Sequence, residues 1–358
     1  MTRPGGPGLW VRLPGRIRFL FSAVPRPCVR RFGIRSGRLG DLREMIRVGI
    51  FGDTGMVGQQ IEKVLNHHGR SGIVFRQNSK RQEGRLEDCD VVFLATRDPE
   101  SMAFAPRVME AGKKAIDISG AFRLPKKTFE AWYHLEHRAP GLLKEAVYGM
   151  PALYRDEIAG ARLVANPGCY PTSVILALRP LQGLVQGQAT VVATSGNSGA
   201  RREVEADSNE VTYNYGRRHK HVPEMELYSR FEVNFTPIVL RSVFAGINTN
   251  IRIELVDDLK ALSEAEAEAR LREAIEAAYG AEDLVETVED SEEVQWGTRN
   301  VAGTHRLLIK LGVDEGFAYL CSMEDNLGKG AASQAVENMN LMQGLPRLYG
   351  IGGAYRTV

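Results

Sequence analysis

A glycine-spaced turn between an apolar strand and a helix constrains the fold of this chain more than any other feature. The apolar segment from Ile46 to Phe51 runs directly into GDTGMVGQQIEKVLNHHG, in which Gly52, Gly55 and Gly58 are three residues apart and apolar residues then recur at helical spacing. Glycines before a helix N-terminus let a pyrophosphate approach the free backbone N–H groups closely. The segment therefore predicts a strand, a turn and a helix that bind a dinucleotide.

The rest of the chain divides into two kinds of pattern. Short, continuously apolar runs such as DVVFLAT and KAIDISG alternate with helical patterns, which is typical of a parallel sheet covered on both faces. We therefore expect a Rossmann-type, doubly wound α/β domain over residues 45–165. Residues 166–325 contain mainly strand-like runs and one strong helix, SEAEAEARLREAIEAAYG, which predicts an α+β domain with a largely antiparallel sheet. A last amphipathic helix, within 326–358, begins with small residues that suit packing against another domain.

Composition narrows the classes of function. The net charge of +2 is too small to indicate nucleic acid as a partner, and no apolar run approaches the roughly 20 residues of a membrane span. The four cysteines, Cys28, Cys89, Cys169 and Cys321, are too far apart for a disulfide framework or a zinc site. We expect a cytoplasmic enzyme that binds no metal, no nucleic acid and no membrane.

The first 44 residues are of a different kind, rich in Arg, Pro and Gly and without an acidic residue before Asp41. Such a leader could be a targeting peptide or a nucleic-acid-binding arm. We favour a disordered or mis-started extension, because Met45 stands immediately before the first credible strand.

The loop after the second strand bears on cofactor choice. An NAD site usually places an acidic residue there for the ribose 2′-hydroxyl, whereas this chain has VFRQNSKRQ. Arg76, Ser79, Lys80 and Arg81 could instead hold a 2′-phosphate, so the sequence favours NADP(H). The other residues expected to bind the cofactor in this part of the chain are Thr54, Met56, Val57 and Thr96.

Cys169, in VANPGCYPTSV, is the candidate nucleophile. If Tyr170 opens a helix, Cys169 lies at or next to its N-cap, and Pro171 occupies the first turn, where its missing N–H costs little. The helix dipole and free N–H groups stabilise a thiolate there. We therefore expect a lowered thiol pKa, and a drop of even one or two units would be worth about 1.4–2.7 kcal/mol.

A nucleophilic cysteine needs a group that exchanges protons with it, most often histidine. His219 and His221 lie in YGRRHKHVPEMEL, where alternation along an extended segment would point both rings the same way. A metal site is the rival interpretation of His-x-His, but no third ligand has suitable spacing. Either histidine could be the acid/base.

Several motifs together resemble the N-acetyl-gamma-glutamyl-phosphate reductase family, relatives of aspartate-semialdehyde dehydrogenase. The resemblance runs from about Ile46 to Leu348 and is carried by GDTGMVG, AIDISGAFRL, LVANPGCYPTSVILAL, TSGNSGARR, RRHKHVPEMEL and DNLGKGAASQAVENMNLM. It implies an NADPH-dependent reduction of an acyl phosphate to a semialdehyde, in arginine biosynthesis. It also implies a homo-oligomer, a dimer or tetramer, whose residues 166–325 carry catalysis and oligomerisation and whose last helix returns to the nucleotide domain.

The resemblance also implies roles for individual residues. It makes Cys169 the residue that forms a thioester. It makes His219 the leading acid/base and His221 a substrate-side partner, although the sequence alone also allows the two histidines to have the opposite roles. The remaining roles are substrate-anion binding by Ser119, Arg123, Asn166, Arg201 and Arg202, and contact with the nicotinamide by Ser198, Gly199 and Asn326.

Two alternatives remain open. The substrate could be the longer aminoadipyl phosphate of lysine biosynthesis, free or linked to a carrier protein, because TSGNSGARR and the Lys220 position depart from the family's usual residues. The second alternative is a nucleotide-sensing protein that has the same fold but no catalytic activity. The presence of Cys169, both histidines and the arginines argues against it.

Overall fold

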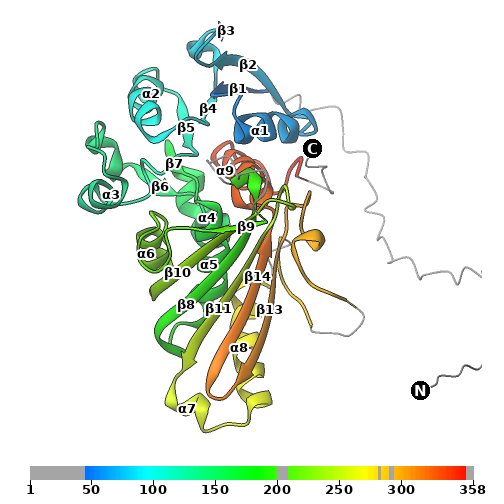
Figure 1. Ribbon diagram of the computed structural model, residues 1–358. Coiled ribbons are helices and arrows are strands. Elements are labelled where there is room, and N and C mark those ends of the chain that lie inside the picture. The colour runs from blue at the N-terminus through cyan, green and yellow to red at the C-terminus, as the bar shows by residue number, and fades with distance from the viewer. Residues whose placement is uncertain (1–44, 200–208, 281–283, 290–293, 352–358) are drawn as a thin grey trace, which may run out of the picture. The chain divides into compact units, whose positions relative to one another are not determined.

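The structure, a computed structural model, describes residues 45–199, 209–280, 284–289 and 294–351 (Figure 1). The leader of residues 1–44, and Arg201 and Arg202, lie outside these residues. Two seven-stranded sheets organise the described chain.

The first sheet is parallel apart from one short edge strand, and its strand order is β3-β2-β1-β4-β5-β7-β6. The glycine turn follows its central strand β1, which pairs with both β2 and β4. The bounds of its strands are β1 Ile46–Phe51, β2 Ser71–Gln77, β3 Gln82–Glu83, β4 Val91–Leu94, β5 Lys114–Asp117, β6 Ala146–Tyr148 and β7 Leu163–Ala165.

Helices cover this sheet because each has an apolar stripe to bury. In α1, Ile61, Val64 and Leu65 enter a buried cluster that also holds Val48 and Ile50 of β1. Each such side chain contributes about 1.5–3 kcal/mol when fully buried. The bounds of the helices in this part of the chain are α1 Met56–Asn66, α2 Asp98–Glu110, α3 Lys126–Tyr133 and α4 Pro151–Gly160.

The second sheet is largely antiparallel, with the order β12-β13-β14-β11-β8-β10-β9. Only the β10–β8 and β12–β13 pairs among its described strands are parallel. The bounds of its strands are β8 Val185–Gly196, β9 Glu210–Thr212, β10 Glu232–Leu240, β11 Ile247–Leu255, β12 Val285–Thr287, β13 Leu307–Asp314 and β14 Phe317–Glu324. The two sheets confirm the fold class expected from the sequence.

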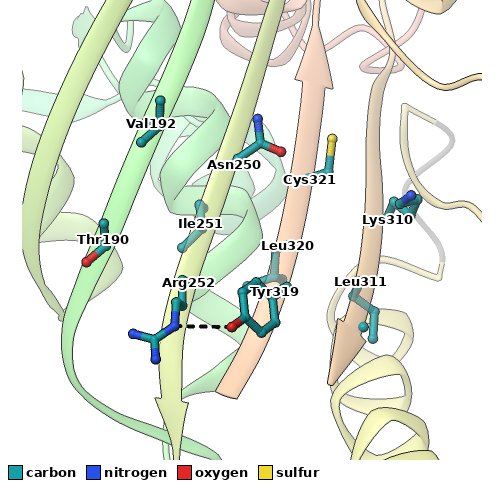
Figure 2. A pocket seen from close by; sticks show the side chains of 11 residues that line it. Thr190, Val192, Asn250, Ile251, Arg252, Lys310, Leu311, Tyr319, Leu320 and Cys321 are labelled. Atoms are coloured by element: carbon teal, nitrogen blue, oxygen red, sulfur yellow. Dashed lines mark hydrogen bonds between the residues drawn. The ribbon is translucent and has the colours of Figure 1, made fainter. Parts of the chain in front are cut away.

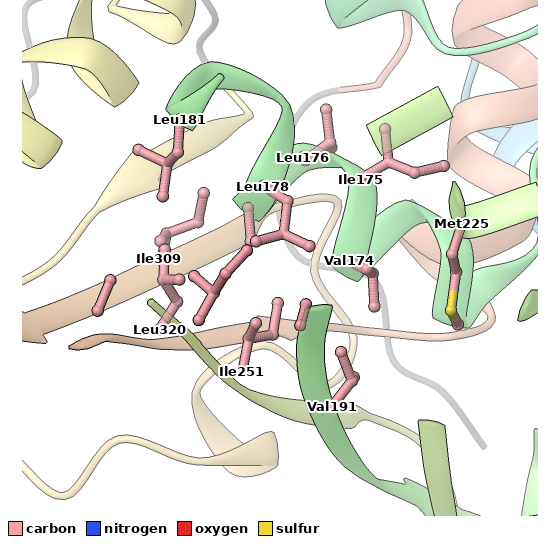
Figure 3. Packing of buried hydrophobic residues seen from close by; sticks show 14 of the residues in the cluster. Val174, Ile175, Leu176, Leu178, Leu181, Val191, Met225, Ile251, Ile309 and Leu320 are labelled. Carbon is pink, nitrogen blue, oxygen red and sulfur yellow. The ribbon is translucent and has the colours of Figure 1, made fainter. Parts of the chain in front are cut away.

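Helix α5, Cys169–Leu178, packs against one face of the second sheet (Figure 3). Every residue of α5 after Cys169 is buried, and Val174 and Leu178 share a cluster with Ile251 and Leu320 of the strands beneath. A helix that is apolar all round has to lie inside the protein. The core therefore holds the N-terminus of α5, and with it Cys169, in a defined place.

Three further helices accompany this sheet. The strong helix expected from the sequence is α8, which begins with a capping box formed by Ser263 and Glu266. Their bounds are α6 Val222–Ser229, α7 Asp257–Lys260 and α8 Glu264–Tyr279.

The final helical segment differs from the single α-helix expected. It opens with a π-helical turn, Gly328–Ala332, and continues as α9, Ser333–Met342. The backbone N–H groups of Gly330 and Ala332 donate to carbonyl oxygens five residues back, those of Asp325 and Leu327. Helix α9 then packs against α1 and α4 beside the first sheet (Figure 1). π-turns are frequent at functional sites, and this one lies beside Cys169.

Candidate active site

Cys169 is the first residue of α5, and Gly168 is its N-cap. No described side chain caps this end, so the backbone N–H groups of the first turn face the region around the thiol. Cys169 as a whole residue keeps some area accessible to solvent, although its thiol is desolvated, whereas all other residues of the helix are buried. The expected helix with Cys169 next to its N-cap is confirmed, and it begins one residue before Tyr170.

The expectation of a lowered thiol pKa is wrong in this structure. Burial raises the pKa of Cys169 to about 12, and the nearby Glu324 carboxyl raises it further. Backbone N–H groups and the Arg123 guanidinium act in the opposite direction without cancelling these effects. The sequence suggested only the helix terminus, because the desolvation and the acidic neighbour arise from segments far away in the chain.

A buried carboxylate, Glu224, organises the turn before Cys169. It accepts hydrogen bonds from the backbone N–H of Gly168 and the hydroxyl of Tyr148, both at 2.9 Å, and forms an ion pair of 3.2 Å with Arg123. Sequence reasoning did not single out Glu224, although an acidic residue at the start of an apolar helix was a usable signal. Glu224 links α6 to the N-terminus of α5.

The two histidines come together, but through a turn rather than the extended segment we expected. The backbone N–H of His221 donates to Nδ1 of His219 at 3.2 Å, and the ring centroids are 4.7 Å apart. Nδ1 of His219 is thus an acceptor, which places the proton of the neutral ring on Nε2.

The surroundings of the two rings differ. His219 is buried among Tyr170, Tyr213 and Phe235, and burial lowers its pKa to about 4. The ring of His221 is partly exposed and lies against the residue before the cysteine, because a methyl group added to Gly168 would be 3.0 Å from its Nε2. His221 is therefore the histidine whose ring lies against the residue before Cys169.

Residues expected to bind the substrate anion are largely committed to other protein groups. Arg123 is buried and donates to the carbonyl oxygens of Ile118 and Asn166 as well as to Glu224. The hydroxyl of Ser119 donates to Asp117 at 2.9 Å. Arg123 still lies next to the cysteine turn, since its Nη1 would be 2.9 Å from a methyl group on Gly168.

Asn166 joins two parts of the fold. Its amide donates to the carbonyl oxygen of Ala331 in the π-turn, and its oxygen accepts from Asn338 of α9. These bonds fix the segment before Cys169 to the last helical segment.

The glycine turn fits a dinucleotide. Gly52 has a φ of +83°, and a Cβ on Gly58 would lie 2.3 Å from the Gly52 carbonyl oxygen, so helix and turn approach closely. Gly55 is the N-cap of α1 and no described side chain caps this end, which leaves its N–H groups for a phosphate. Thr54, Gly55 and Met56 are exposed there, Val57 is partly covered, and the hydroxyl of Thr96 across the sheet edge contacts Ser101 at 2.9 Å.

Two arginines of the loop expected to hold a 2′-phosphate are paired with acidic side chains from other segments, which the sequence of the loop did not show. Arg76 forms an ion pair with Glu62 of α1 at 2.5 Å, and Arg81 forms one with the buried Asp53 of the glycine turn at 2.8 Å. Ser79 and Lys80 are exposed.

The residues expected beside the nicotinamide form one cluster at the end of the second sheet. The amide of Asn326 donates to the hydroxyl of Ser198 at 3.1 Å, and its oxygen accepts from the backbone N–H of Gly246. A methyl group on Gly199 would meet the Asn326 amide at 3.4 Å. The structure therefore brings Ser198, Gly199 and Asn326 together.

A groove of about 420 Å³ lies elsewhere, along the strands of the second sheet (Figure 2). Val192, Asn250, Arg252, Tyr319 and Cys321 line it, and Arg252 donates to the hydroxyl of Tyr319 at 3.2 Å. Val192 and Tyr319 are exposed. This hollow is an open sheet surface remote in sequence from the cysteine turn.

The described residues lack two further kinds of feature. No helix among them is both long and apolar enough to cross a bilayer. They also contain no group of three or more His, Cys, Asp or Glu side chains arranged to hold a metal ion.

Comparison with known proteins gives two domain matches. Residues 76–161 match the semialdehyde dehydrogenase NAD-binding domain, and residues 169–326 match the semialdehyde dehydrogenase dimerisation domain. The chain belongs to the semialdehyde dehydrogenase family. It is accordingly an enzyme of the phosphorylating semialdehyde dehydrogenase type, and the second match begins at Cys169.

Similar full-length proteins carry a more specific name. The N-acetyl-gamma-glutamyl-phosphate reductase of Thermus thermophilus is 37% identical, over 84% of this semialdehyde dehydrogenase and 96% of the relative. A protein of the same name from Clostridium novyi is 34% identical, over 86% and 98% of the two chains. The resemblance expected from the sequence motifs is confirmed.

Solved structures show the same fold at low identity. Aspartate semialdehyde dehydrogenase II from Vibrio cholerae superposes with a TM-score of 0.65 at 19% identity, covering 84% of this chain and 99% of that one. Aspartate semialdehyde dehydrogenase with NADP from Candida albicans has a TM-score of 0.62 at 14% identity, with coverage of 84% and 99%.

Proposed function

We propose that this semialdehyde dehydrogenase reduces N-acetyl-gamma-glutamyl phosphate to N-acetylglutamate 5-semialdehyde and phosphate, with NADPH as reductant, in arginine biosynthesis. The observation that carries the proposal is the placement of Cys169 at the uncapped N-terminus of α5, with His221 against the preceding Gly168. A nucleophile, a proton-transfer group and backbone N–H donors thus meet in one place.

The chemistry follows from these groups. The Cys169 sulfur attacks the acyl carbon, the bond to the phosphate oxygen breaks, and a thioester remains. NADPH, when bound, supplies the hydride that converts the thioester to the aldehyde level. Collapse of the hemithioacetal breaks the carbon–sulfur bond, releases the aldehyde and returns Cys169 as a thiolate.

We assign the proton transfers to His221. Its partly exposed ring can take the thiol proton and later protonate the departing oxygen. His219, whose pKa burial lowers to about 4, stays neutral and holds the His221 backbone through its Nδ1. The backbone N–H groups at the start of α5 would stabilise the developing oxyanion.

NADP(H) is the proposed cofactor. The glycine turn and α1 would hold its pyrophosphate, while Ser198, Gly199 and Asn326 would lie near the nicotinamide. Exposed Ser79 and Lys80 are the free polar groups proposed for a 2′-phosphate, and Arg76 would join them by leaving Glu62. The fold relative from Candida albicans is described with NADP, which supports the choice.

The choice of the acetylglutamyl substrate over the aminoadipyl substrate is based on the names of the similar proteins. The proteins from Thermus thermophilus and Clostridium novyi are both called N-acetyl-gamma-glutamyl-phosphate reductases, which favours the acetylglutamyl substrate. Arg123 lies beside the cysteine turn and, with Ser119, Asn166, Arg201 and Arg202, is proposed to shape the anion-binding region.

We further propose a cytoplasmic homo-oligomer, a dimer or tetramer. The match of residues 169–326 to a dimerisation domain supports assembly, and the exposed Val192 and Tyr319 on the open sheet surface are candidates for the contact (Figure 2).

The deciding experiment is the reverse reaction of the purified protein. Phosphate-dependent reduction of NADP would be measured with N-acetylglutamate semialdehyde, aspartate semialdehyde and the aminoadipate analogue, and repeated with NAD. A rate with the first aldehyde that needs both phosphate and NADP supports the proposal. Activity with only another aldehyde replaces the substrate, and inactivity with all of them favours the nucleotide-sensing alternative.

A further inference from the structure

Glu324, the last residue of β14, is a buried acid for which the proposed reaction has no use. Its side chain is 0% exposed. Neither of its carboxyl oxygens has a hydrogen-bond partner among the described residues. Burial of an isolated carboxylate costs free energy. Such a group therefore either stays protonated or interacts with a neighbouring group that titrates.

The neighbour of Glu324 is the nucleophile. A methyl group added to Gly330 would lie 2.7 Å from Oε1 of Glu324 and 2.8 Å from Cβ of Cys169. The π-turn thus brings a glycine, which has no side chain, between the acid and the cysteine. The two side chains lie on either side of one small space.

We propose that Glu324 and Cys169 form a coupled acid pair that holds at most one negative charge, so that the Glu324 carboxyl sets the pH at which the nucleophile becomes a thiolate. Two anions in one desolvated space repel each other strongly. The pair of acids therefore loses its two protons in separate steps, and the pKa of each step is a property of the pair and not of one residue. In this role Glu324 does not contact the substrate. It is a positioning residue that acts only by changing the pH at which Cys169 loses its proton. The inference rests on the proposed function of Cys169.

The other charged groups around Glu324 leave this coupling intact. Lys329 lowers the Glu324 pKa and Asp325 raises it, but burial is the largest influence and holds the pKa well above its ordinary range. The ammonium of Lys329 donates to Glu337 at 2.7 Å, and Asp325 accepts backbone N–H groups, including that of Leu327 at 2.8 Å.

On the side of the cysteine, three groups face the pair. Arg123 and the backbone N–H groups of α5 lower the Cys169 pKa, whereas Glu324 raises it. His221 lies against Gly168, the residue before the cysteine. Glu324 is therefore the acidic side chain that contributes most to raising the Cys169 pKa.

The test is the pH dependence of Cys169 alkylation by iodoacetamide, followed by peptide mass spectrometry. In Glu324→Gln the negative charge can reside only on sulfur, so the midpoint should fall. Below the midpoint, alkylation should be about tenfold faster for each pKa unit of coupling removed. Cys321, a free thiol on the open face of the second sheet, is the internal control, and Glu254→Gln, at a partly exposed position of β11, is the matched substitution.

An unchanged profile in Glu324→Gln, or slower alkylation than in Glu254→Gln, overturns the proposal. Should the Gln variant fail to fold, Glu324→Met makes the same prediction, because an apolar chain of similar length suits a buried site without a partner.

Failure of the proposed function would look different. Alkylation requires no turnover, so the coupling can be measured in an enzyme whose reaction is unknown. Full turnover by Cys169→Ser would remove the nucleophile assignment and leave the alkylation result standing. In an active enzyme, Glu324→Gln should also move the acidic limb of the kcat/KM profile to lower pH, which loss of packing alone would not do.

Discussion

The carboxylate of Glu224 accepts the backbone N–H of Gly168 at 2.9 Å, one residue before the cysteine that the sequence marks as the nucleophile. The same carboxylate carries the buried ion pair with Arg123. The turn before Cys169 is thus held by a charge supplied from a different helix.

Replacement of Glu224 by alanine should therefore be costly. It leaves Arg123 as an uncompensated buried charge, and we expect the free energy of unfolding to fall by about 3–5 kcal/mol in urea denaturation. Glu254→Ala, which removes a partly exposed ion pair with Lys260, should cost less than about 1 kcal/mol. Equal small losses in both variants would contradict a structural role for the Glu224–Arg123 pair.

Substitution at the nucleophile should separate chemistry from binding. Cys169→Ser should lower kcat by at least about a thousandfold, while NADPH affinity, measured by fluorescence titration, stays near normal. His221→Asn should lower kcat by about 10²–10⁴-fold through loss of proton transfer. A near-normal rate in either variant would refute the corresponding role.

The buried His219 predicts acid sensitivity. Burial lowers its pKa to about 4 from an ordinary value near 6.5. Between these two pH values the histidine is protonated in the unfolded chain but neutral in the folded protein. Stability is then complete above about pH 6.5 and is lost as pH falls through about 4, by up to about 3 kcal/mol for this group. Urea denaturation between pH 7 and 4 should show a smaller loss in His219→Gln than in the wild type, and an equal loss would contradict this assignment.

The glycine turn should not tolerate a side chain. A Cβ at Gly58 would meet the Gly52 carbonyl oxygen at 2.3 Å, so Gly58→Ala has to move α1 relative to the turn and should weaken NADPH binding at least tenfold. Gly160→Ala is the matched control, because nothing lies within 4 Å of the added methyl group. Isothermal titration should show normal affinity in the control only.

The sequence by itself determined the fold class and the family. The spacing of Gly52, Gly55 and Gly58 after an apolar strand predicts the first sheet, and the strand-like runs after Cys169 predict the second; both are local signals in the pattern of residues. The start of α5 at Cys169 was likewise predictable, because glycine and proline mark helix boundaries locally.

Only the tertiary structure decided the electrostatics of the cysteine. Glu224 of α6 and Glu324 of β14 come close to the start of α5 from segments distant in the chain, and the local sequence pattern does not show that they pack there. Burial and charge at Cys169 depend on which segments pack around it, so its raised pKa could not follow from the helix terminus alone. The same holds for the ion pairs of Arg76 and Arg81, whose acidic partners come from α1 and the glycine turn.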